Sequence, residues 1–205
     1  MTEPVFRLIS QDKALSAMAA DLLRRPTALS DLRPADARCV VSYMRMLRCD
    51  EGTVMIREGD QDDTSHMLLL MDGEVSVERM VISRTEPVVV TVLGPGSLIG
   101  EMGVLDGAPR AASCVALSPV LVAALSRGDL RRLMIDEPSV AAKLLVSVSS
   151  RLADRLREAG RQHRVFGQLV HAMQGEIDEL NRQLQMVMDG ASNRQAAMDD
   201  EAGSA

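Results

Sequence analysis

Hydrophobic and polar residues follow different periods in different parts of this 205-residue chain. Between Gln11 and Arg25 the apolar residues recur every three or four positions, which is helical spacing, and Pro26 ends the pattern. A second helical region is predicted between residues 28 and 46, with a proline in its early part. We therefore interpret residues 1–46 as an N-terminal helical segment.

From residue 47 onward the apolar residues occur in short runs that are typical of β-strands. Residues 74–78 alternate polar and apolar side chains strictly, as a half-buried strand does. Glycine-containing turns separate the runs at a spacing of about eight to twelve residues, which favours an antiparallel sandwich or barrel. The predicted strands cover residues 53–57, 66–71, 74–78, 88–93, 113–117 and 120–125.

Helical spacing returns after these strands. A short helix is predicted from Ser126 to Met134, and Pro138 is well suited to the first turn of the next helix. Farther along that helix the apolar residues follow steps of four and three, which fill the a and d positions of a heptad repeat. The repeat consists of Phe166, Val170, Met173, Ile177, Leu180, Leu184 and Val187.

The heptad repeat leaves two interpretations open, an intermolecular coiled coil or a helix that folds back on its own β-domain. The coiled coil is favoured because the apolar stripe is narrow and the other faces are polar. Gly160 and Gly167 each weaken the helix by about 1 kcal/mol relative to alanine, so a joint is expected between residues 159 and 168. We assign residues 138–188 to this helix with its coiled-coil extension, and the polar, aperiodic residues 189–205 to a disordered tail.

Composition and charge exclude several classes of protein. Hydrophobic residues make up 46% of the chain, which indicates a globular protein, and the net charge of −6 argues against a nucleic-acid-binding surface. No apolar run approaches the length of a membrane span and no signal peptide is recognisable, so we expect a cytoplasmic protein without a membrane partner.

Metal binding and catalysis find no support in the sequence. The three cysteines are scattered, as reduced structural thiols are, and the three histidines are dispersed. Asp60, Asp62 and Asp63 are close together but lack the later ligands of an EF-hand. Because no nucleophile–base pair or metal-ligand spacing is present, we predict neither a metal site nor an enzyme.

The stretch Ile99–Ser113 concentrates the candidate chemistry. It contains one acid, Glu101, and one arginine, Arg110, with glycines and a proline between them, and such a segment can curl around a small anion. Arginine offers a planar fork of donors that matches two phosphate oxygens, whereas a carboxylate would repel phosphate and suits a sugar hydroxyl. An acid for a ribose and an arginine for a phosphate indicate a nucleotide. The alternative is a surface loop with an incidental ion pair.

This stretch resembles the phosphate-binding cassette of the cyclic nucleotide-binding domain family, with a Gly-Glu pair followed by a Pro-Arg-Ala-Ala run. Ile99 stands where the family often has phenylalanine. The resemblance implies that Glu101 holds the ribose 2′-hydroxyl and Arg110 the exocyclic phosphate oxygens of cyclic AMP or cyclic GMP. The residues that it implies for ligand binding are Gly100, Glu101, Met102, Gly103, Arg110, Ala111 and Ala112.

Further motifs of the family occur in register at residues 56–60, 73–77 and 93–96, so the resemblance covers roughly residues 32–156. It implies an α+β fold, in which an antiparallel, jelly-roll-like β-roll at residues 47–137 is flanked by N-terminal helices and by the long C-terminal helix with coiled-coil heptads.

The resemblance implies a bacterial signalling protein. Too few residues follow the long helix for the helix-turn-helix domain of catabolite activators, so DNA binding is not expected. The leading hypothesis is a homodimeric cyclic-nucleotide sensor that signals through movement of its C-terminal helix to an unidentified protein partner. In the kinase branch of the family, a serine or threonine directly after the cassette arginine tends to accompany a preference for cyclic GMP. Ala111 stands there and has no hydroxyl, so the resemblance implies cyclic AMP rather than cyclic GMP. Alternatives are an oligomerising scaffold with a vestigial pocket, or a transcription regulator whose basic helix, near residues 151–164, contacts DNA.

Overall fold

The computed structural model describes residues 7–61, 65–79 and 88–202. The chain divides into two compact units, of which the first ends at Leu152 and the second begins at Ala153. Two of the clustered aspartates, Asp62 and Asp63, lie outside the described residues.

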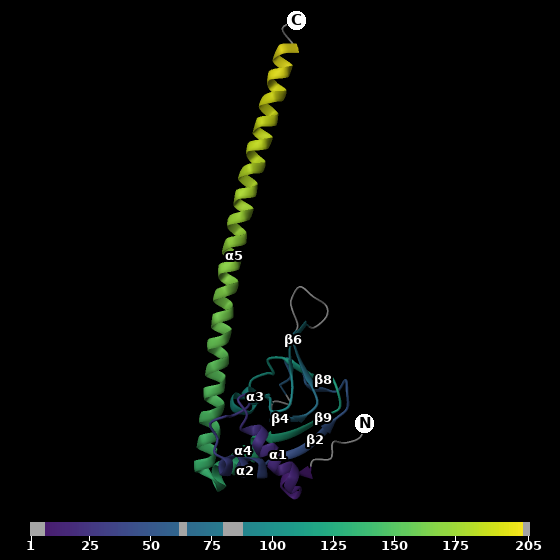
Figure 1. Ribbon diagram of the computed structural model, residues 1–205, viewed down its shortest axis with the longest axis vertical. Helices are drawn as coiled ribbons and strands as arrows, with labels where there is room; N and C mark the ends of the chain where they lie inside the picture. Colours follow the sequence, from purple (N-terminus) through teal and green to yellow (C-terminus); the bar gives the residue numbers. More distant parts are fainter. Residues whose placement is uncertain (1–6, 62–64, 80–87, 203–205) are drawn as a thin grey trace. The chain divides into compact units, whose positions relative to one another are not determined.

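The first unit is built on two antiparallel sheets, which confirms the predicted α+β fold with a β-roll (Figure 1). The five-stranded sheet has, in spatial order, β1 (Arg7–Leu8), β2 (Arg45–Cys49), β9 (Val120–Ser126), β4 (His66–Asp72) and β7 (Leu98–Ile99). The four-stranded sheet has β3 (Val54–Ile56), β8 (Ser113–Ala116), β5 (Val75–Arg79) and β6 (Val88–Leu93). Every predicted strand is present to within one residue at each end, whereas β1, β2 and β7 were not predicted.

The central strand β4 explains why its sequence is a continuous apolar run rather than an alternating one. Met67, Leu69 and Met71 belong to the apolar cluster that includes the helices. The intervening Leu68 and Leu70 belong to the cluster that includes the four-stranded sheet. Because successive side chains of a strand point to opposite faces, β4 is buried on both sides and needs apolar residues at every position.

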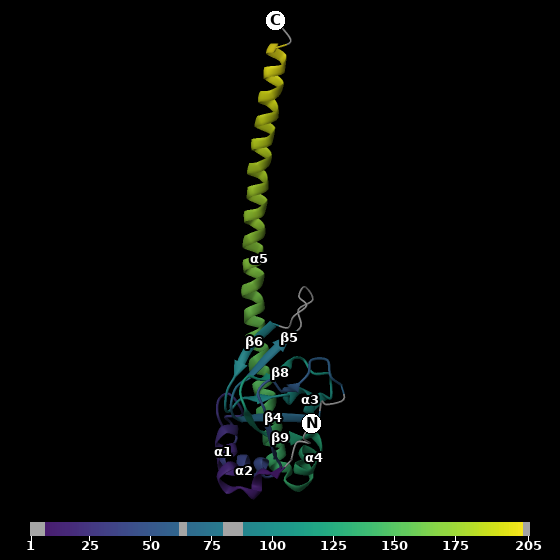
Figure 2. The same cartoon turned by 90° about the vertical axis from the view of Figure 1, so that its right-hand side faces the viewer.

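Helices α1 (Lys13–Leu23), α2 (Pro34–Ser42) and α4 (Arg127–Asp136) lie at one end of this unit, beside β4 and β9 (Figure 1 and Figure 2). Asp12 caps α1, because its carboxylate accepts hydrogen bonds from the backbone N–H groups of Ala14 and Leu15. The second predicted helix is shorter than residues 28–46. Only Pro34–Ser42 is helical, and β2 already begins at Arg45.

The last helix, α5 (Pro138–Ala202), begins in the first unit and completes its core. The apolar side chains that it buries there are Val140, Ala141, Leu144 and Val148. Lys143 Nζ donates hydrogen bonds of 2.9 and 3.0 Å to the two carboxylate oxygens of Asp36 in α2. Packing and this ion pair therefore tie the start of the C-terminal helix to the N-terminal helices.

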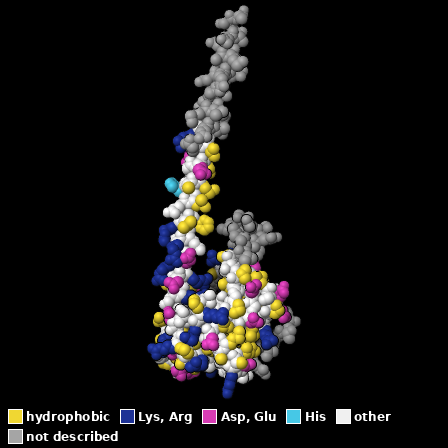
Figure 3. Space-filling view, in the orientation of Figure 1, with side chains coloured by type: hydrophobic (Ala, Val, Ile, Leu, Met, Phe, Trp, Pro, Cys, Tyr) yellow, Lys and Arg dark blue, Asp and Glu magenta, His cyan; other side chains and the backbone are white. Residues whose placement is uncertain are grey.

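The second unit consists of the remainder of α5, up to Ala202. The helix continues across residues 159–168, so the predicted joint does not interrupt it, and across residues 189–202, for which the composition predicts disorder. Apolar side chains follow one side of this helix (Figure 3). The described members of the heptad repeat are between 48% and 65% exposed in the single chain, and the side chains of Leu184 and Val187 lie outside the described residues. The coiled coil itself stays a prediction.

Candidate ligand-binding site

The cassette begins directly after β7 and continues into a short helix, α3 (Glu101–Asp106), where the sequence predicts only a curled segment with turns. A glycine in the left-handed conformation stands at each end of α3, Gly100 with φ of 74° and Gly107 with φ of 70°. Residues with a side chain rarely adopt this conformation, so the two glycines fix where the helix begins and ends.

Gly100 is required for a second reason, which is the close approach of Arg110. A Cβ atom at Gly100 would lie 2.8 Å from Arg110 Nη1 and 3.0 Å from the His66 carbonyl oxygen. Any side chain at this position would therefore displace the arginine or the start of β4. The structure thus explains the glycine of the Gly-Glu pair, both by its backbone conformation and by the lack of space for a side chain.

The guanidinium of Arg110 is buried and held by the backbone. Arg110 is only 6% exposed. Its Nη1 donates a hydrogen bond of 2.9 Å to the carbonyl oxygen of Gly100, and its Nη2 donates one of 2.9 Å to the carbonyl oxygen of His66. These two bonds come from segments that are far apart in the sequence, and together they set the plane of the guanidinium. A planar fork with a fixed orientation can bind two oxygens of one phosphate.

The backbone of Arg110 is anchored as firmly as its side chain. The Arg110 N–H donates to the Asp60 carbonyl oxygen at 3.0 Å, and the Gly59 N–H donates to the Arg110 carbonyl oxygen at 2.8 Å. The turn that follows β3 thus forms one wall of the cassette. The sequence marks this turn only through its glycine and acidic residues, so its contact with Arg110 was not predicted.

The seven predicted site residues differ widely in burial. Glu101, the first residue of α3, is 2% exposed, and Gly103 is also buried. Met102 is 47% exposed, Ala111 is exposed and Ala112 is half-buried. The structure therefore buries the two charged residues that the sequence singles out.

Arg127, at the first position of α4, was not predicted and supports the cassette from behind. Its Nε donates to the Val104 carbonyl oxygen at 3.1 Å and its Nη2 donates to the Gly103 carbonyl oxygen, so it caps the C-terminal end of α3. A Cβ atom at Gly107 would lie 3.0 Å from Arg127 Nη2. A basic residue is unfavourable at the start of its own helix. The unfavourable position of a basic residue at the start of α4 was the one feature of the sequence that could have indicated a role for Arg127 in contacts with another element.

Burial shifts the pKa values of two cysteine thiols. Burial raises the pKa of Cys49, and the nearby Asp50 carboxylate adds to the effect. Burial also raises the pKa of Cys39, with further contributions from Glu137 and Asp36. Both thiols therefore remain protonated at neutral pH, as structural thiols do.

The structure offers no support for a metal site or a membrane span within the residues it describes. Among the residues that the structure describes, no group of three or more His, Cys, Asp or Glu side chains is placed to hold a metal ion. Within the same parts of the chain, every helix is too short or too polar to span a bilayer.

Comparison with known proteins places residues 46–137 under the family model for the cyclic nucleotide-binding domain. The human patatin-like phospholipase domain-containing protein 6 is 28% identical over 127 residues, which are 62% of this chain but only 9% of that protein. The cyclic AMP receptor protein of Thermus thermophilus is 34% identical over 128 residues, which are 62% of this chain and 56% of that protein. The chain thus spans little more than half of the receptor and a small part of the phospholipase.

A crystal structure of a cyclic nucleotide-binding domain from Methylobacillus flagellatus has a similar fold. The TM-score is 0.63 and the sequence identity 28%, over 76% of this chain and 83% of that chain.

Proposed function

Because the chain belongs to the cyclic nucleotide-binding domain family through residues 46–137, we propose that it is a cyclic-nucleotide sensor with its ligand in the cassette. Arg110 binds the exocyclic phosphate oxygens, and Glu101 accepts a hydrogen bond from the ribose 2′-hydroxyl. The backbone of Gly100, Met102 and Gly103 before the spacer, and that of Ala111 and Ala112 after it, completes the site.

The buried and oriented guanidinium of Arg110 is the observation that carries the proposal. The carbonyl groups of Gly100 and His66 hold it at 2.9 Å each, so most of its conformational freedom is already lost before a ligand arrives. An interaction that is pre-organised in this way loses less entropy on binding. The glycine at position 100 is the feature of the sequence that permits this arrangement.

Cyclic AMP is the ligand that we favour. Ala111 directly follows Arg110 and has no hydroxyl with which to contact a guanine. The Thermus thermophilus relative is named as a cyclic AMP receptor, which agrees with this choice.

Signal output is proposed to pass through α5. Its first part packs on the N-terminal helices and is joined to α2 by the Lys143–Asp36 ion pair. Tyr43 Oη, at the end of α2, donates a hydrogen bond of 3.0 Å to Asp136, the last residue of α4. A ligand changes this arrangement only if it binds one position of the helix better than another. The chain then acts without catalysis of its own, in the cytoplasm, on a protein partner that docks on the N-terminal helices or on the C-terminal helix.

Isothermal titration calorimetry of the full chain with cyclic AMP and cyclic GMP tests this function. We expect one site per chain and tighter binding of cyclic AMP. A 2′-deoxy analogue of cyclic AMP should bind more weakly than cyclic AMP itself. The Glu101→Gln substitution should reduce this difference in affinity between the two ligands. Tighter binding of cyclic GMP would refute the base preference, and equal affinity for the deoxy analogue would remove the ribose role of Glu101.

A second candidate function is an oligomerising scaffold with a vestigial pocket. The exposed apolar side chains of α5 in the second unit favour it, because they suit a self-association surface whether or not a ligand binds. The absence of any nucleotide binding in the calorimeter, together with an oligomeric mass, would support the scaffold and reject the sensor.

A further inference from the structure

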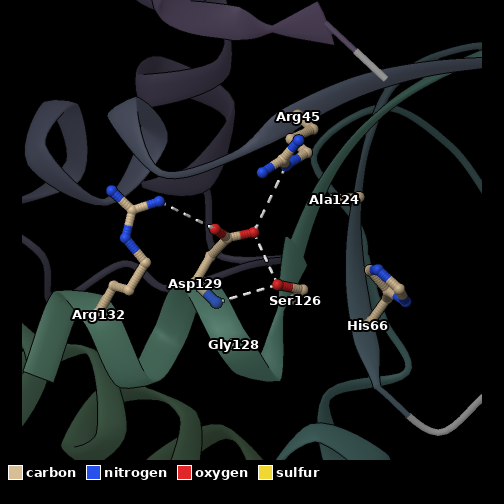
Figure 4. Close-up of a pocket in the computed structure, with 7 residues that line it drawn as sticks. All are labelled: Arg45, His66, Ala124, Ser126, Gly128, Asp129 and Arg132. Carbon is tan, nitrogen blue, oxygen red and sulfur yellow. Dashed lines mark hydrogen bonds and ion pairs between the residues drawn. The ribbon is translucent and has the colours of Figure 1, made fainter. Parts of the chain in front are cut away.

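A pocket that is separate from the cassette lies where β2, β4 and β9 meet the start of α4 (Figure 4). Its volume is about 500 Å³, which lies within the range of small-molecule sites in proteins. The polar side chains that line it are those of Arg45, His66, Ser126, Asp129 and Arg132. None of the seven cassette residues contributes to its lining.

Two arginines approach the central Asp129 from different elements, Arg45 from β2 and Arg132 from α4 (Figure 4). Arg45 Nε lies 3.7 Å from Asp129 Oδ2, and Arg132 Nη1 lies 3.8 Å from Asp129 Oδ1. These distances allow an ion pair but exceed those of a hydrogen bond. Within the described parts of the chain, neither guanidinium donates a hydrogen bond to another residue. Their N–H donors are therefore available to a ligand.

Asp129 is already committed to the fold. It is 6% exposed, its Oδ2 accepts a hydrogen bond of 2.6 Å from Ser126 Oγ, and its own N–H donates to that hydroxyl at 2.9 Å. This reciprocal arrangement caps the start of α4. One carboxylate faces two arginines, so these three side chains give the pocket an excess of one positive charge.

We propose that this pocket binds a small organic oxyanion, a carboxylate or a phosphate ester, between Arg45 and Arg132. Arginine side chains bind both kinds of group through charge-assisted hydrogen bonds. The volume leaves space for an organic body beside the anionic group. His66 and Ser126 line the same pocket and offer polar contacts to that body.

The proposed pocket and the cassette share His66. Its ring lines the pocket and accepts or donates a hydrogen bond with Ser65 Oγ at 2.9 Å, while its carbonyl oxygen accepts the bond from Arg110 Nη2. A test of the pocket must therefore show that the oxyanion does not simply enter the nucleotide site. Variants of Arg110 and of the two pocket arginines separate these possibilities.

Calorimetry of the full chain at low ionic strength, with citrate and with ribose 5-phosphate as probes, tests the proposal. At least one probe should bind at one site per chain. Arg45→Gln and Arg132→Gln should each weaken that binding at least ten-fold. Arg110→Leu and the control Arg131→Gln, an exposed residue of the same helix as Arg132, should change it by less than about two-fold.

Thermal unfolding followed by circular dichroism shows whether each variant is folded. Because Arg132 is 68% exposed, its variant should fold even if the Arg45 variant does not. Failure of the wild type to bind either probe would overturn the proposal. An Arg132→Gln protein that binds the probe with the affinity of the wild type would overturn it as well. Loss of binding in Arg110→Leu would place the oxyanion in the cassette, and binding of a glutamate-rich peptide in place of both probes would make the pocket a protein-docking site.

Discussion

Arg110 and Glu101 are both almost completely removed from water, with exposed fractions of 6% and 2%. Burying a charged side chain is costly unless polar partners surround it. The guanidinium of Arg110 donates hydrogen bonds to carbonyl groups of β4 and of the residue before α3. The glycine at position 100 leaves space for the guanidinium and for the His66 carbonyl group. A surface loop with an incidental ion pair needs none of these features, so the geometry favours a binding role for the pair.

Replacing Arg110 tests that role. We expect Arg110→Leu to weaken cyclic AMP binding at least ten-fold, because charge-assisted bidentate hydrogen bonds to the phosphate are lost. Arg110→Lys should restore only part of the affinity, since a point charge cannot reproduce the planar fork. Titration calorimetry measures both effects, and circular dichroism reports whether the fold is retained.

The matched control is Arg131→Leu, which removes an exposed arginine of α4 and should leave the affinity unchanged. A dissociation constant for Arg110→Leu equal to that of the wild type would reject the assignment of the phosphate site.

The thiol of Cys49 gives a prediction that depends on pH. Burial raises its pKa, and because the thiolate is the reactive form, its alkylation at pH 7 should be slower than that of free cysteine. The rate should increase as the pH rises through the elevated pKa. Mass spectrometry after timed exposure to iodoacetamide measures this. Reaction of Cys49 at the rate of free cysteine at pH 7 would contradict its burial in the folded chain.

At the scale of elements, the sequence predicts the strands well and the cassette helix poorly. Strand β4 is readable because burial on two faces demands an unbroken apolar run. Helix α3 is too short for a helical period, and its flanking glycines suggest turns when they in fact form its caps. Strands β1 and β7 have two residues each, which is too few for any pattern.

The contacts that organise the site come from residues distant in sequence, and no local pattern reveals them. The bonds of Arg110 to His66 and Asp60, and those of Arg127 to α3, depend on how the strands pair. The identity of the charged pair in the cassette could be predicted, because the acid and the arginine stand within one glycine-rich stretch. The hydrogen bonds that hold the charged pair in place could not be predicted.

Arg127 is expected to act on the ligand site through α3. Arg127→Gln removes the charged donor to the carbonyl groups of Val104 and Gly103, so it should lower the free energy of unfolding by about 1–3 kcal/mol. It should also weaken cyclic AMP binding several-fold, although we assign Arg127 no contact with the ligand. Urea denaturation and calorimetry measure the two effects.

The control for Arg127 is Arg131→Gln in the same helix, which should change neither quantity. An Arg127→Gln protein that is destabilised but binds with full affinity would show that the cap serves stability alone.

At the scale of the whole molecule, α5 belongs to both units, and the burial of its apolar side chains differs between them. In the first unit, Val140, Ala141, Leu144 and Val148 of this helix are buried in the same apolar cluster as the N-terminal helices. In the second unit, the apolar side chains from Phe166 to Leu180 are exposed in the single chain. Isolated helices are marginal in water, so this part of α5 requires a partner surface to be stable. The heptad spacing makes a second copy of the same helix the simplest partner.

We therefore predict that the full chain is at least a dimer. Burial of each large aliphatic side chain of the repeat contributes roughly 1.5–3 kcal/mol before the loss of entropy is counted, which favours association at modest concentration. Light scattering should give a mass of two or more protomers. Truncation after Gly160 should lower that mass and leave cyclic AMP binding largely in place, because the cassette lies in the first unit.

Single substitutions sharpen this test. Ile177→Asp places a charge in the a position of the repeat and should dissociate the oligomer, whereas His171→Asp, on another face of the same helix, should not. Leu169 is 54% exposed outside the a and d positions and widens the apolar surface, so the spacing alone does not choose between two helices and more. A full chain that remains monomeric at high micromolar concentration would show that the stripe does not associate with a second copy.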